Sequence, residues 1–235
     1  MRIGCPREIK PQEYRVGLLP AAVREAVAHG HHVRIEAGAG LGVGCPDAAY
    51  REAGADLVDS AEAVFRESDL IVKVKEPQPT ERAWLGEGQV LFTYLHLAAD
   101  PEQTRDLLAS GVTAIAYETV TDAAGGLPLL APMSEVAGKL APQVGAWALQ
   151  RANGGRGVLL GGVVGVEPAR VVVVGGGTVG QQAARVAAGM GADVVVLDRS
   201  LARLRALDAV DAGRYRTAWT SPGNLPDWFA GADLI

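Results

Sequence analysis

Short apolar runs alternate with longer amphipathic segments along most of the chain. The apolar runs are rich in β-branched residues and predict strands at Arg2–Cys5, Val33–Ala37, Leu70–Val74, Val90–Tyr94, Thr113–Tyr117, Val171–Val174 and Val194–Asp198. The segments between them carry Ala and Leu at helical spacing and predict helices at Pro20–His29, Pro46–Ala53, Ala61–Glu67, Pro101–Ser110 and Gly180–Met190. Strands separated by helices of this length are typical of βαβ units, so the pattern predicts an α/β fold with parallel sheets.

The pattern changes near residue 130. Pro132 and Ser134 predict the start of a helix, with Ser134 as its N-cap, and Pro142 predicts a kink or a break inside it. A glycine-rich stretch without clear periodicity follows. We therefore predict one domain at 1–130, a connecting helix and crossover at 131–167, and a second domain at 168–235. The second domain holds little more than the first half of a doubly wound nucleotide-binding fold, so we expect the chain to be a fragment.

Composition excludes several classes of protein. The chain has 235 residues, with 22 Lys and Arg against 27 Asp and Glu and a net charge of -5, which argues against a nucleic-acid partner. Only Cys5 and Cys45 are available for disulfides, as expected in a reducing compartment. We find no signal peptide and no apolar run long enough to cross a membrane, and we expect a cytoplasmic protein without a membrane partner.

The glycine-rich segment VVVVGGGTVG carries the sharpest functional signal. Gly175, Gly177 and Gly180 form G-x-G-x-x-G between a predicted strand and a predicted helix, and Asp198 ends the next strand. This arrangement is typical of a Rossmann-like domain, whose turn and helix N-terminus bind a pyrophosphate. The carboxylate of Asp198 favours NAD over NADP, although Arg199 beside it could accept a 2′-phosphate. The alternative is a structural glycine turn between Ala-packed elements.

The first domain places polar residues near strand ends. Arg15 precedes a predicted helix, Lys75 follows one strand and His96 follows another. Arginine binds carboxylates with two hydrogen bonds, and histidine is the usual proton carrier near neutral pH, so the set suits a small amino or oxo acid. Each residue also has a structural interpretation, as a surface cation, a solvated strand end or a hydrogen-bonded histidine. The His29, His31 and His32 turn has no further ligands at metal spacing, and we expect no metal site.

Taken together, these segments resemble the N-terminal two-thirds of the bacterial alanine dehydrogenase family. The resemblance spans Met1 to Ile235 and is carried by blocks such as PREIKPQEYRVGLLP, LIVKVKEP, LFTYLHLA, LPLLAPMSEVAGKLA and VVVVGGGTVG. It implies an NAD-dependent oxidoreductase that interconverts L-alanine with pyruvate and ammonium, and that assembles as a homo-oligomer, usually a hexamer. The family has a second catalytic carboxylate beyond the end of this chain, so we expect the chain alone to be nearly inactive.

The resemblance also implies roles for individual residues. Arg15 matches the position that binds the substrate carboxylate in the family. Lys75 matches the position that contacts the carboxyl and carbonyl end of the substrate together with it, and His96 matches the general acid and base. The positions that match cofactor contacts are Ser134, Thr178, Val179, Asp198, Arg203 and Thr220. Competing interpretations are the NAD(H)-binding subunit of a proton-translocating transhydrogenase, a saccharopine or lysine dehydrogenase relative, and a non-catalytic NAD-binding module.

Overall fold

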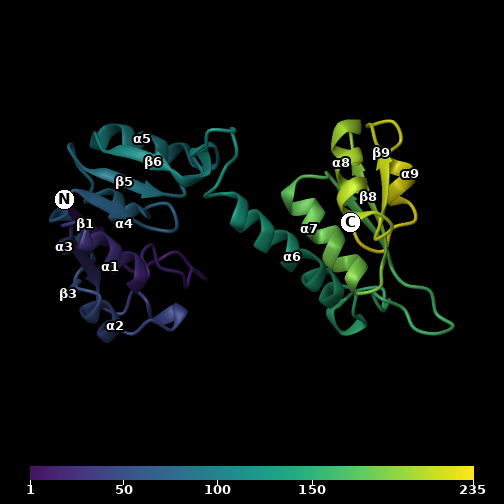
Figure 1. Cartoon of the computed structure of the whole chain (residues 1–235), viewed down its shortest axis with the longest axis horizontal. Helices are drawn as coiled ribbons and strands as arrows, with labels where there is room; N and C mark the ends of the chain where they lie inside the picture. The colour runs from purple at the N-terminus through teal and green to yellow at the C-terminus, as the bar shows by residue number, and fades with distance from the viewer. The chain divides into compact units, whose positions relative to one another are not determined.

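Parallel strand pairing organises both halves of the chain. The computed structural model describes residues 1–235, which divide into a first unit, Met1–Leu127, and a second unit, Pro128–Ile235. Each unit is built on its own parallel sheet with helices packed against it (Figure 1). The predicted α/β class is therefore confirmed. The second unit begins before the connecting helix, which the sequence had placed between the domains.

The first unit contains a six-stranded sheet with the order β3-β2-β1-β4-β5-β6. Its strands are β1 (Arg2–Cys5), β2 (His32–Glu36), β3 (Asp56–Val58), β4 (Leu70–Val72), β5 (Val90–Thr93) and β6 (Thr113–Ala116). Its helices are α1 (Pro20–Ala28), α2 (Asp47–Glu52), α3 (Ala61–Arg66), α4 (Pro79–Arg82) and α5 (Pro101–Ser110), with short 3-10 turns η1 (Leu41–Val43), η2 (Leu97–Ala99) and η3 (Tyr117–Thr119). The strand order reverses between β1 and β4, and ligands of open α/β sheets bind at such a point.

Local signals in the sequence account for where these helices begin and end. The side chain of Asp100 accepts a hydrogen bond from the Gln103 amide at 2.9 Å, Pro101 occupies the first turn of α5, and Gly111 ends the helix in a left-handed conformation. The core then forms where the apolar faces meet, and Ile35, Phe65 and Leu91 are completely buried. Strands that are covered on both faces have continuous apolar sequences, which explains the apolar runs in this chain.

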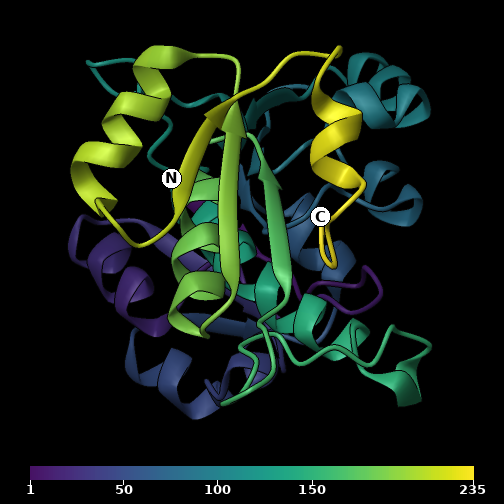
Figure 2. The ribbon, with the colours of Figure 1, turned by 90° about the vertical axis from the view of Figure 1, so that its right-hand side faces the viewer.

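The second unit contains a three-stranded sheet with the order β7-β8-β9. Its elements are β7 (Arg170–Val174), β8 (Asp193–Asp198), β9 (Arg216–Trp219), α6 (Ala131–Ala148), α7 (Thr178–Gly189), α8 (Leu201–Asp211), α9 (Leu225–Phe229) and the 3-10 turn η4 (Arg151–Asn153). Figure 2 shows the three strands side by side with their arrowheads pointing the same way. On the other side of β7, Leu234 forms a parallel bridge to Val171, and its carbonyl accepts the Val172 amide at 2.9 Å.

Helix α6 differs from its prediction in two respects. It begins at Ala131 with Leu130 as its N-cap, so Ser134 lies inside the helix, and it continues through Pro142 without interruption. The reason is packing against α7 (Figure 1), because a Cβ atom at Gly138 would lie only 2.4 Å from the Val179 carbonyl oxygen. Such tertiary contact stabilises a helix beyond its local propensity.

Other differences lie at short elements and strand ends. Strands β3 and β9 and helices α4 and α9 were not predicted, and α7 begins at Thr178 rather than Gly180. The strand predicted to run to Val74 ends at Val72 because the Val74 and Lys75 amides donate to the Glu8 carboxylate, at 2.6 and 3.3 Å, instead of to another strand.

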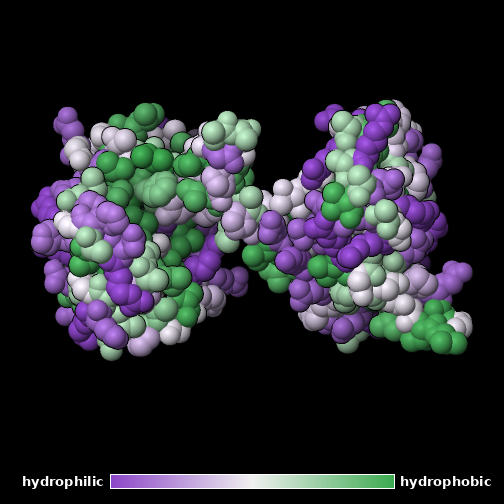
Figure 3. All heavy atoms as spheres, in the orientation of Figure 1, coloured by the Kyte–Doolittle hydropathy of each residue, from purple (hydrophilic) through white to green (hydrophobic).

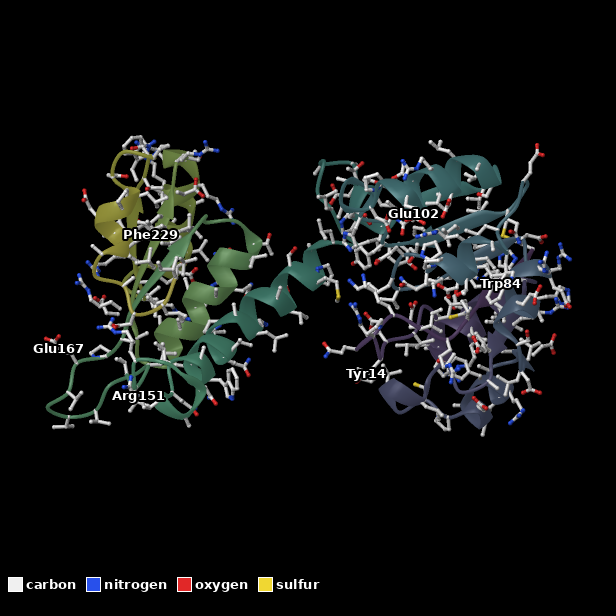
Figure 4. The ribbon with its side chains drawn as sticks, turned by 180° about the vertical axis from the view of Figure 1, so that it is seen from behind. Tyr14, Trp84, Glu102, Arg151, Glu167 and Phe229 are labelled. Carbon is white, nitrogen blue, oxygen red and sulfur yellow. The ribbon has the colours of Figure 1, made fainter.

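The glycine-rich crossover forms a projecting loop in the second unit. Val163 and Val166 form an antiparallel bridge around a tight turn, and Gly165 adopts φ +85°. Apolar side chains gather at the tip of this loop (Figure 3), where Leu159, Val163, Val164 and Val166 are exposed, and Glu167 lies on the same loop (Figure 4). None of the helices in the structure combines the length and the apolarity that a membrane-spanning helix needs.

The buried carboxylate of Asp211 joins α7 to α8. It accepts hydrogen bonds from Gln181 at 3.1 Å, from Arg185 at 2.8 Å and from the Tyr215 hydroxyl at 2.7 Å. Burial opposes the charged form, but the hydrogen bonds from Arg185, Tyr215 and Gln181 lower the pKa of Asp211 to about 2.

This shift predicts a pH-dependent contribution to stability. Because the folded pKa lies below the value of about 3.9 for an unfolded Asp, the contribution is complete above that pH and is lost as the pH falls towards 2. We expect Asp211→Asn to lower the free energy of unfolding by about 1–3 kcal/mol at neutral pH. Urea denaturation at several pH values should then show a weaker acid dependence for the variant, and parallel curves would contradict the assignment.

Candidate active site and dinucleotide site

The candidate residues of the first unit lie in segments that leave the carboxyl ends of neighbouring strands. Arg15 follows β1, Lys75 follows β4 and His96 follows β5. The parallel pairing of β1 with β4 and of β4 with β5 brings these three segments to the same edge of the sheet. This is the edge at which α/β sheets bind their ligands.

A close backbone approach brings the segment of Arg15 to this edge. A Cβ atom at Gly17 would lie 2.6 Å from the Val72 carbonyl oxygen, so only glycine lets this segment cross the end of β4. The Glu13 carboxylate accepts hydrogen bonds from Arg15 Nε at 2.8 Å and from its terminal nitrogen at 2.6 Å. These hydrogen bonds raise the pKa of Arg15, and together with the nearby charge of Lys75 they lower the pKa of Glu13. Tyr14, between the two, lies at the edge of the first unit and is 69% exposed (Figure 4).

Lys75 is held through its backbone. Its amide donates to Glu8 at 3.3 Å, and its carbonyl accepts the Thr93 hydroxyl at 2.8 Å. The other oxygen of Glu8 accepts from the buried Lys73 ammonium at 3.2 Å, and Lys73 also donates to Glu81 at 2.7 Å. Burial disfavours a charged lysine, yet the two carboxylates raise the pKa of Lys73 above its usual value. The segment that carries Lys75 is therefore anchored on a buried, charged cluster.

His96 lies three residues after the end of β5, at the start of the 3-10 turn η2. It adopts φ 50°, which is rare for a residue other than glycine, and its ring is 47% exposed. The ring stacks on Tyr94, with centroids 5.9 Å apart and planes 5° from parallel. The Glu118 carboxylate accepts the amides of Leu95 at 3.1 Å and His96 at 2.7 Å.

Tyr94 connects these groups electrostatically. Burial raises the pKa of its hydroxyl, and the positive charge of Arg15 opposes that effect. Arg15, Lys75 and His96 thus belong to one polar cluster that also includes Glu13, Tyr94 and Glu118. The cluster offers two cations for an anionic ligand and one imidazole for proton transfer.

The glycine turn of the second unit follows β7. Gly175 adopts φ +99°, and a Cβ atom at Gly180 would lie 1.9 Å from the Gly175 carbonyl oxygen, so the turn packs directly against the start of α7. At Gly177 a Cβ atom would meet nothing within 4 Å, and no side chain caps the N-terminus of α7. The surface above Gly177 is therefore open and faces the positive end of a helix dipole.

Asp198 and Arg203 hold this turn through hydrogen bonds to the backbone of Gly176. The Asp198 carboxylate accepts the Gly176 amide at 2.7 Å and the Ser200 amide at 2.7 Å, and these hydrogen bonds lower its pKa. Arg203 donates from Nε to the Gly176 carbonyl oxygen. A side chain at Gly176 would collide with Leu207, 2.6 Å away, so the middle glycine of the run is needed for packing.

Two cavities of the second unit share the glycine turn. One, of about 510 Å³, runs along β7 to Leu234, and its lining includes the candidate residues Ser134, Gly175, Gly177, Thr178, Val179 and Gly180. The other, of about 370 Å³, is lined by Gly175, Asp198, Arg199 and Thr220 among others. The Thr220 hydroxyl bonds to Asn224 at 3.1 Å. Arg203 is the candidate that lines neither cavity, because its side chain bonds to the turn itself.

These features fit a dinucleotide. The uncapped amides and open glycine surface suit a pyrophosphate, while Asp198 and Thr220 offer polar oxygens to one side of it. The structure contains no group of three or more His, Cys, Asp and Glu side chains that could hold a metal ion.

Sequence reasoning missed the residues that hold the candidates in place: Glu8, Glu13, Glu118 and Gly176. Glu13 could have been found from its spacing to Arg15, and Glu118 from its position just after a predicted strand. Glu8 gives no such signal, because only the folded chain brings it to Lys73 and Lys75.

Comparison with known proteins places these sites in a family. Residues 4–137 match the N-terminal domain of alanine dehydrogenase/PNT, and residues 141–235 match its C-terminal domain. The chain is 55% identical over 235 residues to an alanine dehydrogenase of Mycobacterium tuberculosis and 48% identical to that of Bacillus subtilis. These matches cover the whole chain but 63% and 62% of those proteins, so the chain spans less than two-thirds of their length.

Solved structures agree with this relationship. An L-alanine dehydrogenase superposes with a TM-score of 0.92 at 49% identity, covering 100% of this chain and 65% of that one. A transhydrogenase from Sinorhizobium meliloti superposes with a TM-score of 0.79 at 24% identity, which shows a shared fold. The chain belongs to the alanine dehydrogenase/PNT family, with the N-terminal domain followed by a C-terminal domain that carries the glycine turn.

Proposed function

We propose that the protein is an NAD-dependent L-alanine dehydrogenase, which converts L-alanine, NAD and water into pyruvate, ammonium, NADH and a proton, and catalyses the reverse reaction. The observation that carries this proposal is the polar cluster of Arg15, Lys75 and His96 at one sheet edge. Its support is the 55% identity, over the whole chain, to an alanine dehydrogenase.

The two cations of the cluster account for binding of the substrate. A guanidinium binds a carboxylate through two hydrogen bonds, and an ammonium adds a point charge that can also reach a carbonyl oxygen. Glu13 holds the guanidinium of Arg15, and Glu8 holds the backbone segment that carries Lys75, before any substrate arrives. Fixing the carboxylate orients the Cα–H bond of alanine, and orientation is itself a large part of catalysis.

His96 accounts for proton transfer. Oxidation of the amino acid requires loss of a proton from the amine and then from the attacking water, and amination requires the reverse. An imidazole that is 47% exposed and stacked on Tyr94 can accept and return such protons.

The glycine turn accounts for the cofactor. We propose that Gly175, Gly177 and Gly180 bind the pyrophosphate with Thr178 and Val179, that Asp198 and Thr220 face the adenosine ribose, and that Ser134 faces the cavity along β7. When bound, a nicotinamide dinucleotide accepts the hydride from Cα. Arg203 has a supporting role, because it bonds to the Gly176 carbonyl.

Asp198 leads us to propose NAD rather than NADP. Its carboxylate is fixed by the Gly176 and Ser200 amides and would repel a 2′-phosphate. We expect Asp198→Asn to lower the ratio of NADH to NADPH affinity about tenfold, or about 1.4 kcal/mol. Fluorescence titration with both cofactors measures this ratio. Asp208→Asn, on the exposed side of α8, is the control and should leave it unchanged; an unchanged ratio in Asp198→Asn would contradict the role of that carboxylate.

Assembly and location follow the family in this proposal. We propose a homo-oligomer, a hexamer by family resemblance, acting in the cytoplasm on L-alanine, pyruvate and ammonium, with no nucleic-acid or membrane partner. The cysteines are both free, as a reducing compartment would keep them.

The decisive experiment measures NADH formation from L-alanine and NAD by a full-length protein that contains this chain, because the 235-residue chain alone is expected to be nearly inactive. We expect alanine-dependent reduction of NAD, and loss of alanine saturation in Arg15→Ala with NADH binding retained. NADH binding without any alanine-dependent turnover would indicate a non-catalytic NAD-binding module. Hydride exchange between two nicotinamide nucleotides without alanine would instead indicate a transhydrogenase.

A further inference from the structure

We propose that Glu118 is the positioning residue of His96, a role that rests on the proposed function of His96 as the proton-transfer group. The pairing of β5 with β6 brings the two residues together, because Thr93 and Ala116 are register partners and each strand ends there. His96 lies three residues after the end of β5 and Glu118 two residues after the end of β6, so the sheet register places the carboxylate beside the imidazole turn.

The first part of the argument is the backbone of His96. This residue has φ 50°, and apart from Gln12 it is the one residue other than glycine with a positive φ. A conformation of this kind persists only where surrounding contacts hold it. Glu118 supplies such contacts, since Oε1 accepts the amides of both Leu95 and His96, at 3.1 and 2.7 Å. The carboxylate thus holds the peptide unit that aims the imidazole.

The second part is the ring. Nδ1 of His96 lies 3.9 Å from the same Oε1 atom, which is a charge contact rather than a hydrogen bond. Tyr94 covers one face of the ring in a nearly parallel stack. With Nδ1 turned to the carboxylate, Nε2 is the nitrogen that exchanges protons with the substrate.

The third part is the ionisation of Glu118 itself. Burial raises the pKa of its carboxyl, but the amides of His96 and Leu95 and the nearby imidazole outweigh burial, so the pKa is lower than usual. The group is therefore charged at neutral pH.

A second carboxylate shows the same backbone pattern on the neighbouring strand. Glu8 accepts the amides of Val74 and Lys75 after β4, just as Glu118 accepts those of Leu95 and His96 after β5. The difference is the third partner of each carboxylate. Glu8 bonds to the buried Lys73, whereas Glu118 faces the imidazole. Glu118 alone of the two acts on a proton-transfer group.

The first test needs no activity. The chain contains four histidines, so spectra of histidine-labelled protein should resolve four imidazole signals, and His96→Asn identifies one of them. In Glu118→Ala we expect the His96 signal to shift or broaden while the other three stay in place. An unmoved His96 signal would overturn the proposal, whatever reaction the protein catalyses.

The second test is kinetic and uses the full-length protein that contains this chain. We expect Glu118→Ala to lower kcat about 10- to 100-fold, as loss of a supporting carboxylate commonly does, with KM for alanine and NADH affinity nearly unchanged. Glu118→Gln should recover part of kcat, because its amide oxygen still accepts the backbone hydrogen bonds without the charge. Glu52→Ala, at an exposed residue of α2, is the control.

The outcomes separate this proposal from the proposed function. Unchanged kcat in both Glu118 variants, or a parallel loss of kcat, NADH affinity and thermal stability in both, would overturn the positioning role. Absence of alanine turnover in the unmodified full-length protein would overturn the proposed function instead, and the imidazole spectra would still decide whether Glu118 holds His96. Glu118→Gln serves for both measurements if Glu118→Ala does not fold.

Discussion

The His96→Ala variant of the full-length protein that contains this chain is expected to lose about 10²- to 10⁴-fold of its rate of alanine oxidation, while it binds NADH as the unmodified full-length protein does. The expected loss is large because His96 is the imidazole of the Arg15, Lys75 and Tyr94 cluster, and no other histidine follows a strand end there. NADH binding should be unaffected because the glycine turn lies in the other unit of the fold.

Steady-state kinetics and NADH titration check this expectation together. His32→Ala is a matched control, since that residue is exposed on β2 and should tolerate the change. If kcat and NADH affinity fell together in His96→Ala, or if the thermal midpoint fell with them, His96 would be a structural residue of the strand end.

Gly177→Ala is expected to weaken NADH binding about 10- to 100-fold, or about 1.4–2.8 kcal/mol, without lowering thermal stability. A Cβ atom at this position meets no protein atom within 4 Å, and φ of -68° suits alanine, so the fold should accept it. The added methyl group would instead occupy the space that a pyrophosphate needs over the N-terminus of α7.

Two glycines within α7 serve as comparisons for Gly177, the N-cap of that helix. Gly189→Ala, where a Cβ atom also meets nothing within 4 Å, should leave NADH affinity unchanged and can raise stability by up to about 1 kcal/mol. Gly180→Ala should lower thermal stability, since its Cβ would lie 1.9 Å from the Gly175 carbonyl oxygen. Titration and thermal unfolding of the three variants measure both properties. Equal NADH affinity in Gly177→Ala and Gly189→Ala would contradict a pyrophosphate above Gly177.

The secondary structure was largely predictable where local signals and burial agree. The apolar runs that became β1, β7 and β8 and the capped helix α5 appear within a residue of their expected bounds. The short strands β3 and β9 were not predicted, because Asp56–Val58 and Arg216–Trp219 owe their extended form to pairing with β2 and β8. The kink or break predicted at Pro142 is absent from α6, because packing against α7 outweighs the local cost of a proline.

The order of residues along the chain was enough to determine the parallel α/β class, the glycine turn between β7 and α7, and the family, since periodicity, glycine spacing and strand-end chemistry are local properties. Only the tertiary structure decided what holds the candidate residues in place. Glu8 meets Lys75, Glu118 meets His96, and Asp198 meets Gly176 through strand pairing and loop crossings that no local pattern records. A carboxylate accepts any nearby amide, so its partner is chosen by the register of the folded sheet.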